Sequence, residues 1–345
     1  MTPNAAEILK QYPLAVRSIR LLSWKGKKGA WAVQTDRGMK VLKKSPASKT
    51  RQMFLNQAVR HLQSNGAPIP NLVQTRSGTD IAEFKGECYV LSDAVQGSAP
   101  EYDTPAQLQQ IMKTLGRFHL ASRGFAGTGQ VDERMHLGHW EDGYVQHLND
   151  LETFKERAKR GSSSFSKLYL KHADAFIRHG QEALRSIQSG AYSEWVRKVE
   201  RQKNLCHQDF AAGNLIRTSK GMYVIDMDSL TYDLPARDLR KIFNKVMKKK
   251  GWSLERSVAM LKAYHSVHPL SADEYSVVKA DLLFPHLFYG ISSKYYKRRT
   301  EAEWDMGKTV EKLGAMIRSE SSKVNVLNQW DLAVQRVMAQ RSGMS

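Results

Sequence analysis

The segment from Leu205 to Ser229, LCHQDFAAGNLIRTSKGMYVIDMDS, constrains the fold more than any other part of the chain. It contains a His-x-Asp ending at Asp209, then Asn214, and then Asp226 at the end of the apolar run MYVI. MYVI has the β-branched and aromatic bias of a strand, and the run from Asn214 to Arg217 reads as the strand before it. The SKG between them has turn composition. A hairpin would therefore bring Asn214 beside Asp226, with Asp209 on the loop that enters the same corner.

This corner has the side chains that phosphoryl transfer requires. An aspartate near an acceptor hydroxyl can take its proton, which is the role expected of Asp209. Asn214 and Asp226 offer the hard oxygen ligands that Mg²⁺ prefers when it holds the phosphates of ATP. A His-x-Asp alone is common on protein surfaces, but the full spacing before a strand that ends in Ile-Asp is far more specific. The segment therefore predicts ATP and Mg²⁺ as cofactors.

HQDFAAGNLI followed by YVIDMDSL resembles the catalytic segment of the aminoglycoside phosphotransferase and choline kinase superfamily, whose members are related to protein kinases. Within it, the chain is most similar to the CotS-like spore coat kinases, which share a helical passage like FSKLYLKHADAFIRHGQEAL. The resemblance implies an α+β, bilobal protein-kinase-like fold. Residues 1–96 would form a small antiparallel β-sheet lobe that binds the nucleotide and ends in the hinge. Residues 97–345 would form the larger, mainly helical lobe with the catalytic loop and substrate site.

Composition excludes several classes of protein. The 345 residues suffice for two lobes, and a 41% hydrophobic content fits a globular chain. No apolar run is long enough to cross a membrane, and the N-terminus lacks the features of a secretory signal. Cys88 and Cys206 lie in apolar contexts, so buried free thiols in a reducing cytosol are expected.

The formal net charge of +19 favours anionic partners such as nucleotides. No RNA- or DNA-binding motif accompanies the charge, so nucleic acid is disfavoured as the main partner. The run Lys294-Tyr-Tyr-Lys-Arg-Arg299 interleaves aromatic rings with positive charge, which would suit base stacking or a phosphorylated partner. The end of an amphipathic helix is at least as good an interpretation.

Strands are expected over residues 18–23, 30–35 and 39–43, with the basic turn KGKKG between the first two. A phosphate-covering loop occupies this place in kinases, although the glycine spacing here is not G-x-G-x-x-G. Alternation along the third strand would send Val41 and Lys43 to one face. Lys43 resembles the lysine that contacts the α- and β-phosphates, and Lys40 and Lys44 are its competitors.

A helix is expected over residues 52–64, where kinases usually offer a glutamate to the strand lysine. The matching position is Gln57, and no carboxylate occurs on this helix. A neutral amide can hydrogen-bond an ammonium but cannot neutralise it, so the question of activity stays open. Further strands are expected over residues 72–75, 81–84 and 87–92. The resemblance implies that the next stretch, SDAVQG, is the hinge, with main-chain contacts to adenine at Ser92 and Ala94.

The remaining hydrophobic periodicity predicts a chain of helices. They are expected over residues 5–16, 104–122, 140–160, 166–187, 193–201, 241–250, 252–265, 272–286, 303–319 and 324–340.

These observations predict an ATP-dependent phosphotransferase that moves the γ-phosphoryl of MgATP to a hydroxyl of an unidentified acceptor. A small molecule or a spore coat protein fits as the acceptor, whereas cationic aminoglycosides fit a basic chain poorly. The resemblance implies a role in spore coat formation, with other coat proteins as candidate partners. It also implies a location in the mother-cell cytoplasm or at the spore coat. The alternative is a non-catalytic coat scaffold with a pseudokinase fold. Gln57 favours that alternative, and the complete set of Asp209, Asn214 and Asp226 argues against it.

Overall fold

The computed structural model describes residues 5–128, 136–297 and 305–339, and its chain forms two compact units. The first unit comprises residues 1–135 and 202–232, and the second comprises residues 136–201 and 233–345. All of the predicted site residues belong to the first unit. A lobe boundary after residue 96 stays a prediction.

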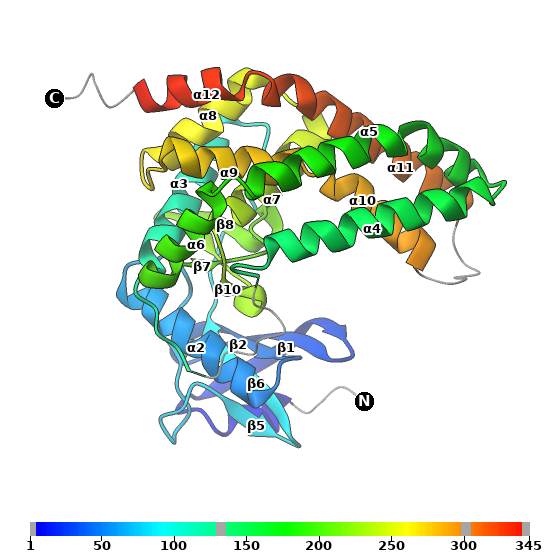
Figure 1. Cartoon of the computed structure of the whole chain (residues 1–345). Helices are drawn as coiled ribbons and strands as arrows, with labels where there is room; N and C mark the ends of the chain where they lie inside the picture. Colours follow the sequence, from blue (N-terminus) through cyan, green and yellow to red (C-terminus); the bar gives the residue numbers. More distant parts are fainter. Residues whose placement is uncertain (1–4, 129–135, 298–304, 340–345) are drawn as a thin grey trace. The chain divides into compact units, whose positions relative to one another are not determined.

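The first unit is built on a six-stranded antiparallel sheet, drawn in blue to cyan in Figure 1. Its strands run in the order β1-β2-β3-β6-β4, and β5 also pairs with β6. Short turns join β1, β2 and β3, which is why neighbours in sequence are neighbours in the sheet. The strands are β1 (Val16–Lys25), β2 (Lys28–Thr35), β3 (Gly38–Lys44), β4 (Leu72–Val73), β5 (Ala82–Phe84) and β6 (Glu87–Asp93).

The two faces of this sheet have different chemistry, because successive side chains on a strand point to opposite faces. Trp31, Leu42 and Leu91 pair across β2, β3 and β6 and lie in a buried cluster with helix α1 (Ala5–Leu9). Val41 and Lys43 alternate with Leu42 and so belong to the other face. The sheet therefore has one face in the core and one face available for a site.

Helix α2 (Lys49–Ser64) follows β3, and residues at its two ends explain where it begins and stops. The Ser48 side chain accepts a hydrogen bond from the Arg51 N–H, which is the usual N-terminal cap. Gly66 follows at a φ of 74°, a conformation that favours glycine and stops the helix. The predicted start at residue 52 was three residues late, because the Ser48 cap was not recognised.

The rest of the first unit carries the predicted catalytic segment. Helix α3 (Pro105–Ala121), expected over residues 104–122, begins with proline, whose fixed φ suits the first turn. The remaining elements are β7 (Leu205–Cys206), the 3₁₀ turn η2 (Ala212–Asn214), β8 (Leu215–Thr218), β9 (Gly221–Val224), the 3₁₀ turn η3 (Met227–Ser229) and β10 (Thr231–Tyr232). β8 pairs with β9, and β7 pairs with β10.

The described part of the second unit is helical. Its helices are α4 (Trp140–Lys159), α5 (Ser164–Ile187), α6 (Ala191–Gln202), α7 (Ala236–Lys250), α8 (Leu254–His265), α9 (Ala272–Leu283), α10 (His286–Lys297), α11 (Met306–Leu327) and α12 (Trp330–Met338). The two long helices α4 and α5 lie side by side in Figure 1. No described helix has the length and apolar character needed to span a membrane.

A buried carboxylate links four helices of the second unit. Asp281 on α9 accepts hydrogen bonds from the Tyr144 hydroxyl of α4 at 2.6 Å and from Arg240 Nε of α7 at 3.1 Å. His286 Nε2 of α10 lies 2.8 Å from the same carboxylate. Burial alone would raise the pKa of Asp281, but Arg240 and His286 hold it well below its ordinary value. The charge is therefore matched on several sides, as a buried carboxylate requires.

The predicted α+β organisation is confirmed, with corrections at helix ends. The helix predicted over residues 5–16 ends at Leu9, because Tyr12 turns inward to the sheet core and Pro13 follows. The helix predicted over residues 272–286 is two helices. Pro285 lacks an N–H and disfavours helical backbone at Phe284, so α9 ends and α10 begins at His286.

The C-terminal helices also divide at a different place from the predicted one. The prediction ended a helix at residue 319, whereas α11 continues to Leu327. Glu320 and Lys323 are both buried and pair with each other within α11. Glu320 Oε1 also accepts the Leu287 N–H at 2.7 Å, and Lys323 Nζ donates to the Phe284 carbonyl at 3.5 Å. This pair therefore supports the corner between α9 and α10.

We predict that Glu320→Gln lowers the free energy of unfolding by about 3–5 kcal/mol, because it leaves the Lys323 ammonium buried without its counter-ion. The matched control is Glu156→Gln on α4, whose partner Lys159 is also three residues away but exposed. That change should cost less than about 1 kcal/mol. Chemical denaturation of both variants measures the difference. Equal unfolding midpoints for the two variants would contradict a supporting role for the buried pair.

Candidate functional site

The predicted hairpin forms and sets the geometry of the site. β8 and β9 pair with Leu215 opposite Val224, so the end of β9 returns to the start of β8. The Ile225 N–H donates to the Asn214 carbonyl at 2.9 Å, which brings the residue before Asp226 against Asn214. Asn214 itself closes the 3₁₀ turn η2, one residue before the strand that it was predicted to begin.

Asp209 and Asn214 are in direct contact. Asn214 Nδ2 donates to Asp209 Oδ2 at 3.0 Å and to the Asp209 carbonyl at 2.9 Å. Because the amide nitrogen is the donor, the Oδ1 of the same amide is the atom with metal-ligand chemistry. The Asp209 side chain is exposed, as a proton acceptor for an incoming hydroxyl must be.

His207 holds this loop against the end of the hairpin. The residue is fully buried, and its Nε2 lies 3.1 Å from the Ile225 carbonyl. The ring packs edge-on to Phe118 and Phe210. Ile225 is therefore held on its N–H by Asn214 and on its carbonyl by His207, which fixes Asp226 beside it. This geometry suits a brace and gives His207 no exposed proton-transfer position.

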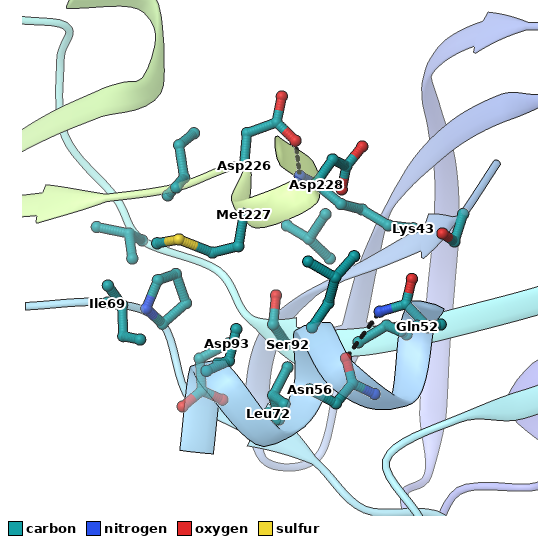
Figure 2. A pocket seen from close by; sticks show the side chains of 18 of the residues that line it. Lys43, Gln52, Asn56, Ile69, Leu72, Ser92, Asp93, Asp226, Met227 and Asp228 are labelled. Atoms are coloured by element: carbon teal, nitrogen blue, oxygen red, sulfur yellow. Dashed lines mark hydrogen bonds and ion pairs between the residues drawn. The ribbon is translucent and has the colours of Figure 1, made fainter. Parts of the chain in front are cut away.

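Lys43 is the strand lysine that reaches the hairpin. Its Nζ lies 3.1 Å from Asp226 Oδ1, across a sequence separation of 183 residues (Figure 2). The two competing lysines are used elsewhere: Lys40 pairs with Asp93 at 2.5 Å, and Lys44 pairs with Glu87 at 2.6 Å. The structure thus brings together the predicted phosphate lysine and the predicted metal carboxylate.

Asp226 is held in an uncommon conformation and a strong field. Its φ of 66° and ψ of 67° lie in the left-handed region, which aspartate tolerates better than most residues. Burial alone would raise the pKa of Asp226. The positive charge of Lys43, its hydrogen bond and the charge of Lys28 lower that pKa below its ordinary value. The carboxylate is therefore ionised at neutral pH and has the chemistry of a cation ligand.

A pocket of the first unit is lined by Lys43 and Asp226, whereas Asp209 and Asn214 are not among its lining residues. Its empty space, with the open mouth included, is about 950 Å³. Apolar side chains of β3, β6, α2 and the hairpin line one side, and Lys43, Asp226 and Asp228 line another (Figure 2). A base would suit the apolar part and phosphates the charged part. Mg²⁺ commonly takes one or two protein ligands plus substrate phosphates, and the oxygen donors of Asn214 and Asp226 fit that requirement.

The hinge contacts expected at Ser92 and Ala94 stay a prediction, and the sheet register shows which of their main-chain groups are already bonded. The Ala94 N–H donates to the Met39 carbonyl at 3.0 Å. Hydrogen-bonded pairs recur at every second residue of an antiparallel ladder, so Ser92 also bonds to its partner Val41 through its main chain. The Ser92 side chain lines the pocket instead. Val95 lines the same pocket, and no acceptor within the described ranges takes its N–H, so Val95 is the better position for a main-chain contact.

The helix position predicted to face Lys43 is wrong. The Gln57 amide bonds to Thr128, with its Nε2 3.2 Å from the hydroxyl and its Oε1 accepting the Thr128 N–H at 2.9 Å. Gln52 and Asn56 line the Lys43 pocket instead, and Gln52 Nε2 donates to Asn56 Oδ1 at 2.7 Å (Figure 2). The helical period identified the helix but not the side that meets the sheet.

Two further residues, Tyr102 and Lys28, were missed by sequence reasoning. The Tyr102 hydroxyl accepts the Ala212 N–H at 2.8 Å and so supports the turn that ends at Asn214. Lys28 Nζ, from the basic turn between β1 and β2, pairs with Asp228 Oδ2 at 2.9 Å. The charge of this turn is evident in the sequence, but its partner is not. Nothing in the sequence around Tyr102 signals its role, because its contact lies 110 residues away.

The aromatic residues of the basic run at 294–299 are occupied within the second unit. Tyr295 stacks on Phe165 with ring centroids 3.8 Å apart, and Tyr296 stacks on Phe154 at 5.2 Å. Lys294 remains exposed, and Arg298 and Arg299 lie outside the described residues. Rings packed in this way offer no platform for base stacking, which favours the interpretation as the end of an amphipathic helix.

Comparison with known proteins gives matches along nearly the whole chain. Residues 8–330 match the family described as "Spore coat putative kinase YutH". A curated relative, spore coat protein S of Bacillus subtilis (strain 168), is 36% identical over 338 residues, which cover 97% of this chain and 96% of the relative. The resemblance to spore coat kinases predicted from the catalytic segment is thereby confirmed.

Solved structures confirm the kinase-like fold. An aminoglycoside phosphotransferase from Alicyclobacillus acidocaldarius superposes with a TM-score of 0.80 at 19% identity, covering 97% of both chains. Spectinomycin phosphotransferase APH(9)-Ia, solved in complex with ADP and spectinomycin, gives a TM-score of 0.61 at 12% identity over 94% of this chain and 97% of that chain. At such low identities, these likenesses establish the fold alone.

We predict that Gly97→Ala destabilises the first unit by about 1–3 kcal/mol. Ser98 and Arg217 exchange main-chain hydrogen bonds of 3.2 and 2.8 Å, which tie the segment after the hinge to β8. A Cβ on Gly97 would lie 2.2 Å from the Arg217 carbonyl oxygen, so this bridge must shift. Gly143→Ala, where a Cβ meets no atom within 4 Å, is the control. Thermal unfolding measures both, and equal midpoints would contradict the prediction.

Proposed function

Since the chain belongs to the family of spore coat kinases described as YutH, we propose that it is an ATP-dependent phosphotransferase that acts in spore coat formation. It would move the γ-phosphoryl group of MgATP to a hydroxyl of an acceptor. The observation that supports this most strongly is the 3.1 Å contact between Lys43 and Asp226, in the same pocket as the apolar wall for a base. Lobes of residues 1–96 and 97–345 remain part of the proposal.

Each site residue has a role in the proposed reaction. Asp209 orients the acceptor hydroxyl and takes its proton as the phosphoryl group leaves ATP. Asn214 positions Asp209 through its Nδ2, and its Oδ1 with Asp226 holds Mg²⁺, which when bound supplies positive charge to the phosphates. Lys43 leaves Asp226 for the α- and β-phosphates, and Val95 offers its N–H to the edge of the base. Catalysis on this scheme comes from position and electrostatics.

The acceptor fits best as an anionic, neutral or macromolecular hydroxyl compound. A formal net charge of +19 disfavours a cationic aminoglycoside, whose binding needs acidic side chains. The curated relative is named as a spore coat protein, which supports coat proteins as acceptors or partners and the spore coat or the mother-cell cytoplasm as the location.

A coat scaffold that retains the fold without turnover is the second candidate. It would account for α2, which carries no carboxylate and presents the Gln52 and Asn56 amides to the Lys43 pocket. The scaffold retains the pocket, so nucleotide binding alone does not separate the two proposals.

We expect Asp209→Asn to reduce MgATP-dependent phosphorylation by about 10²–10⁴-fold, because it removes the proton acceptor. An asparagine Oδ1 can still accept the Asn214 amide hydrogen bond, so the loop should keep its shape. Phosphate transfer is measured with sugars, amino alcohols and coat proteins as acceptors. The control is Asp331→Asn, which neutralises an exposed carboxylate on α12.

Turnover in the wild type and the control but not in Asp209→Asn would establish the kinase. If wild type binds MgATP yet equals Asp209→Asn with every acceptor, the scaffold proposal replaces it.

A further inference from the structure

The basic turn between β1 and β2 is held in place from β3. Lys44 Nζ lies 3.4 Å from the Gly26 carbonyl and 4.9 Å from the centre of the Trp24 ring. Gly29 packs under the same ring, where an added Cβ would lie 2.7 Å from it. The turn is therefore anchored by side-chain packing. Lys28, which begins β2, has a defined position.

Lys28 belongs to the face of the sheet that carries Lys43. Residues two apart on a strand share a face, so Lys28 and Ala30 point the same way. Ala30 pairs with Lys43 across β2 and β3, and paired residues also share a face. The small side chain of Ala30 leaves space between the two lysines. The pocket face thus carries one cation from β3 and another from the anchored turn.

Each of these lysines pairs with an aspartate at the end of the hairpin. Lys43 lies 3.1 Å from Asp226, and Lys28 lies 2.9 Å from Asp228, two residues further on. The side chains are partly exposed, at 40% and 38% in the first pair and 54% and 32% in the second. Ion pairs with this exposure are weak and exchange readily. A nucleoside triphosphate offers the lysines more negative charge, and the released carboxylates are hard ligands for a divalent cation.

We propose that Lys28 is a second phosphate-binding lysine, which Asp228 holds over the pocket until a nucleotide with a divalent cation exchanges both ion pairs. The inference rests on the proposed function to the extent that MgATP binds in this pocket. Lys28 would contact the phosphates furthest from the base, because it projects from the turn at the end of the sheet. Asp228 would then join Asp226 at the cation. Lys28 and Asp228 together make the site select nucleotides by their number of phosphates.

The first test compares ATP, ADP and AMP binding to the full chain by calorimetry in the presence of Mn²⁺. Lys28→Gln should weaken ATP binding by about 10- to 100-fold, the effect of one lost charge-assisted contact, and leave AMP binding within about twofold. Lys27→Gln removes the same charge from the neighbouring residue of the turn and should leave all three affinities within about threefold. Lys28→Arg, which keeps the charge, should recover most of the ATP affinity.

The affinity for Mn²⁺ in the absence of nucleotide is a second measurement, and Lys28→Gln should raise it. Removing the Lys28 charge leaves Asp228 available to a cation, so Lys28→Gln should bind Mn²⁺ alone about two- to fivefold more tightly than wild type. A variant that is merely damaged would bind both Mn²⁺ and ATP more weakly. Asp228→Asn should abolish this gain when it is combined with Lys28→Gln.

Equal losses for ATP and AMP, or a loss in Lys27→Gln as large as that in Lys28→Gln, would overturn the inference. These binding results are independent of turnover. If Lys28→Gln weakens ATP binding more than AMP binding in a protein that transfers no phosphate, the inference is retained and the kinase is rejected. If the protein transfers phosphate but Lys28→Gln weakens ATP and AMP binding equally, the kinase is retained and the role of Lys28 is rejected. A wild type that binds no nucleotide would reject both.

Discussion

The ion pair between Lys43 and Asp226 is the contact on which the site depends. It joins the N-terminal sheet to the hairpin 183 residues later, and it requires both partners to be placed by their own local structure. Strand alternation directs Lys43 to the pocket face. The left-handed backbone at Asp226, fixed by the two hydrogen bonds of Ile225 to Asn214 and His207, turns its carboxylate toward the lysine. Each half of the site therefore has local contacts of its own in addition to the ion pair.

The two carboxylates at the end of the hairpin are close to electrically balanced by lysines of the sheet. Asp226 and Asp228 each have a lysine within about 3 Å, so neither carboxylate nor ammonium is left without a counter-ion. This balance limits the repulsion that two close carboxylates would otherwise produce. The same ion pairs add a cost to binding of a single charged ligand. A cation alone would have to displace the lysines, and a phosphate alone would have to displace the carboxylates. Ligands that bring both charges at once avoid either penalty, so on the proposed function metal and nucleotide would bind together.

Features that depend on local spacing, such as the hairpin, could be predicted from the sequence. Features that depend on how a helix or strand is aligned with its neighbours could not. The hairpin and the corner that it shares with the Asp209 loop follow from short-range turns, whereas Lys43 was favoured over Lys40 and Lys44 by its position in the resembling motif. The prediction that Gln57 faces Lys43 was wrong because helical periodicity identifies an apolar face of a helix but does not show which polar residues of that helix meet the sheet. The hinge contacts at Ser92 and Ala94 stay a prediction, because a strand's free main-chain groups depend on its neighbours, and Met39 takes the Ala94 N–H.

The missing glutamate on α2 has a different meaning once these contacts are considered. In a chain whose helix carried a carboxylate near Lys43, that carboxylate would compete with Asp226 for the ammonium. Here the Gln52 and Asn56 amides bond to each other and, in the described part of the chain, Asp226 is the carboxylate that pairs with Lys43. An amide pair orders the helix without adding charge to the pocket. The position of Lys43 then depends on the hairpin and not on the helix, so the absence of a helix carboxylate does not by itself argue for an inactive protein.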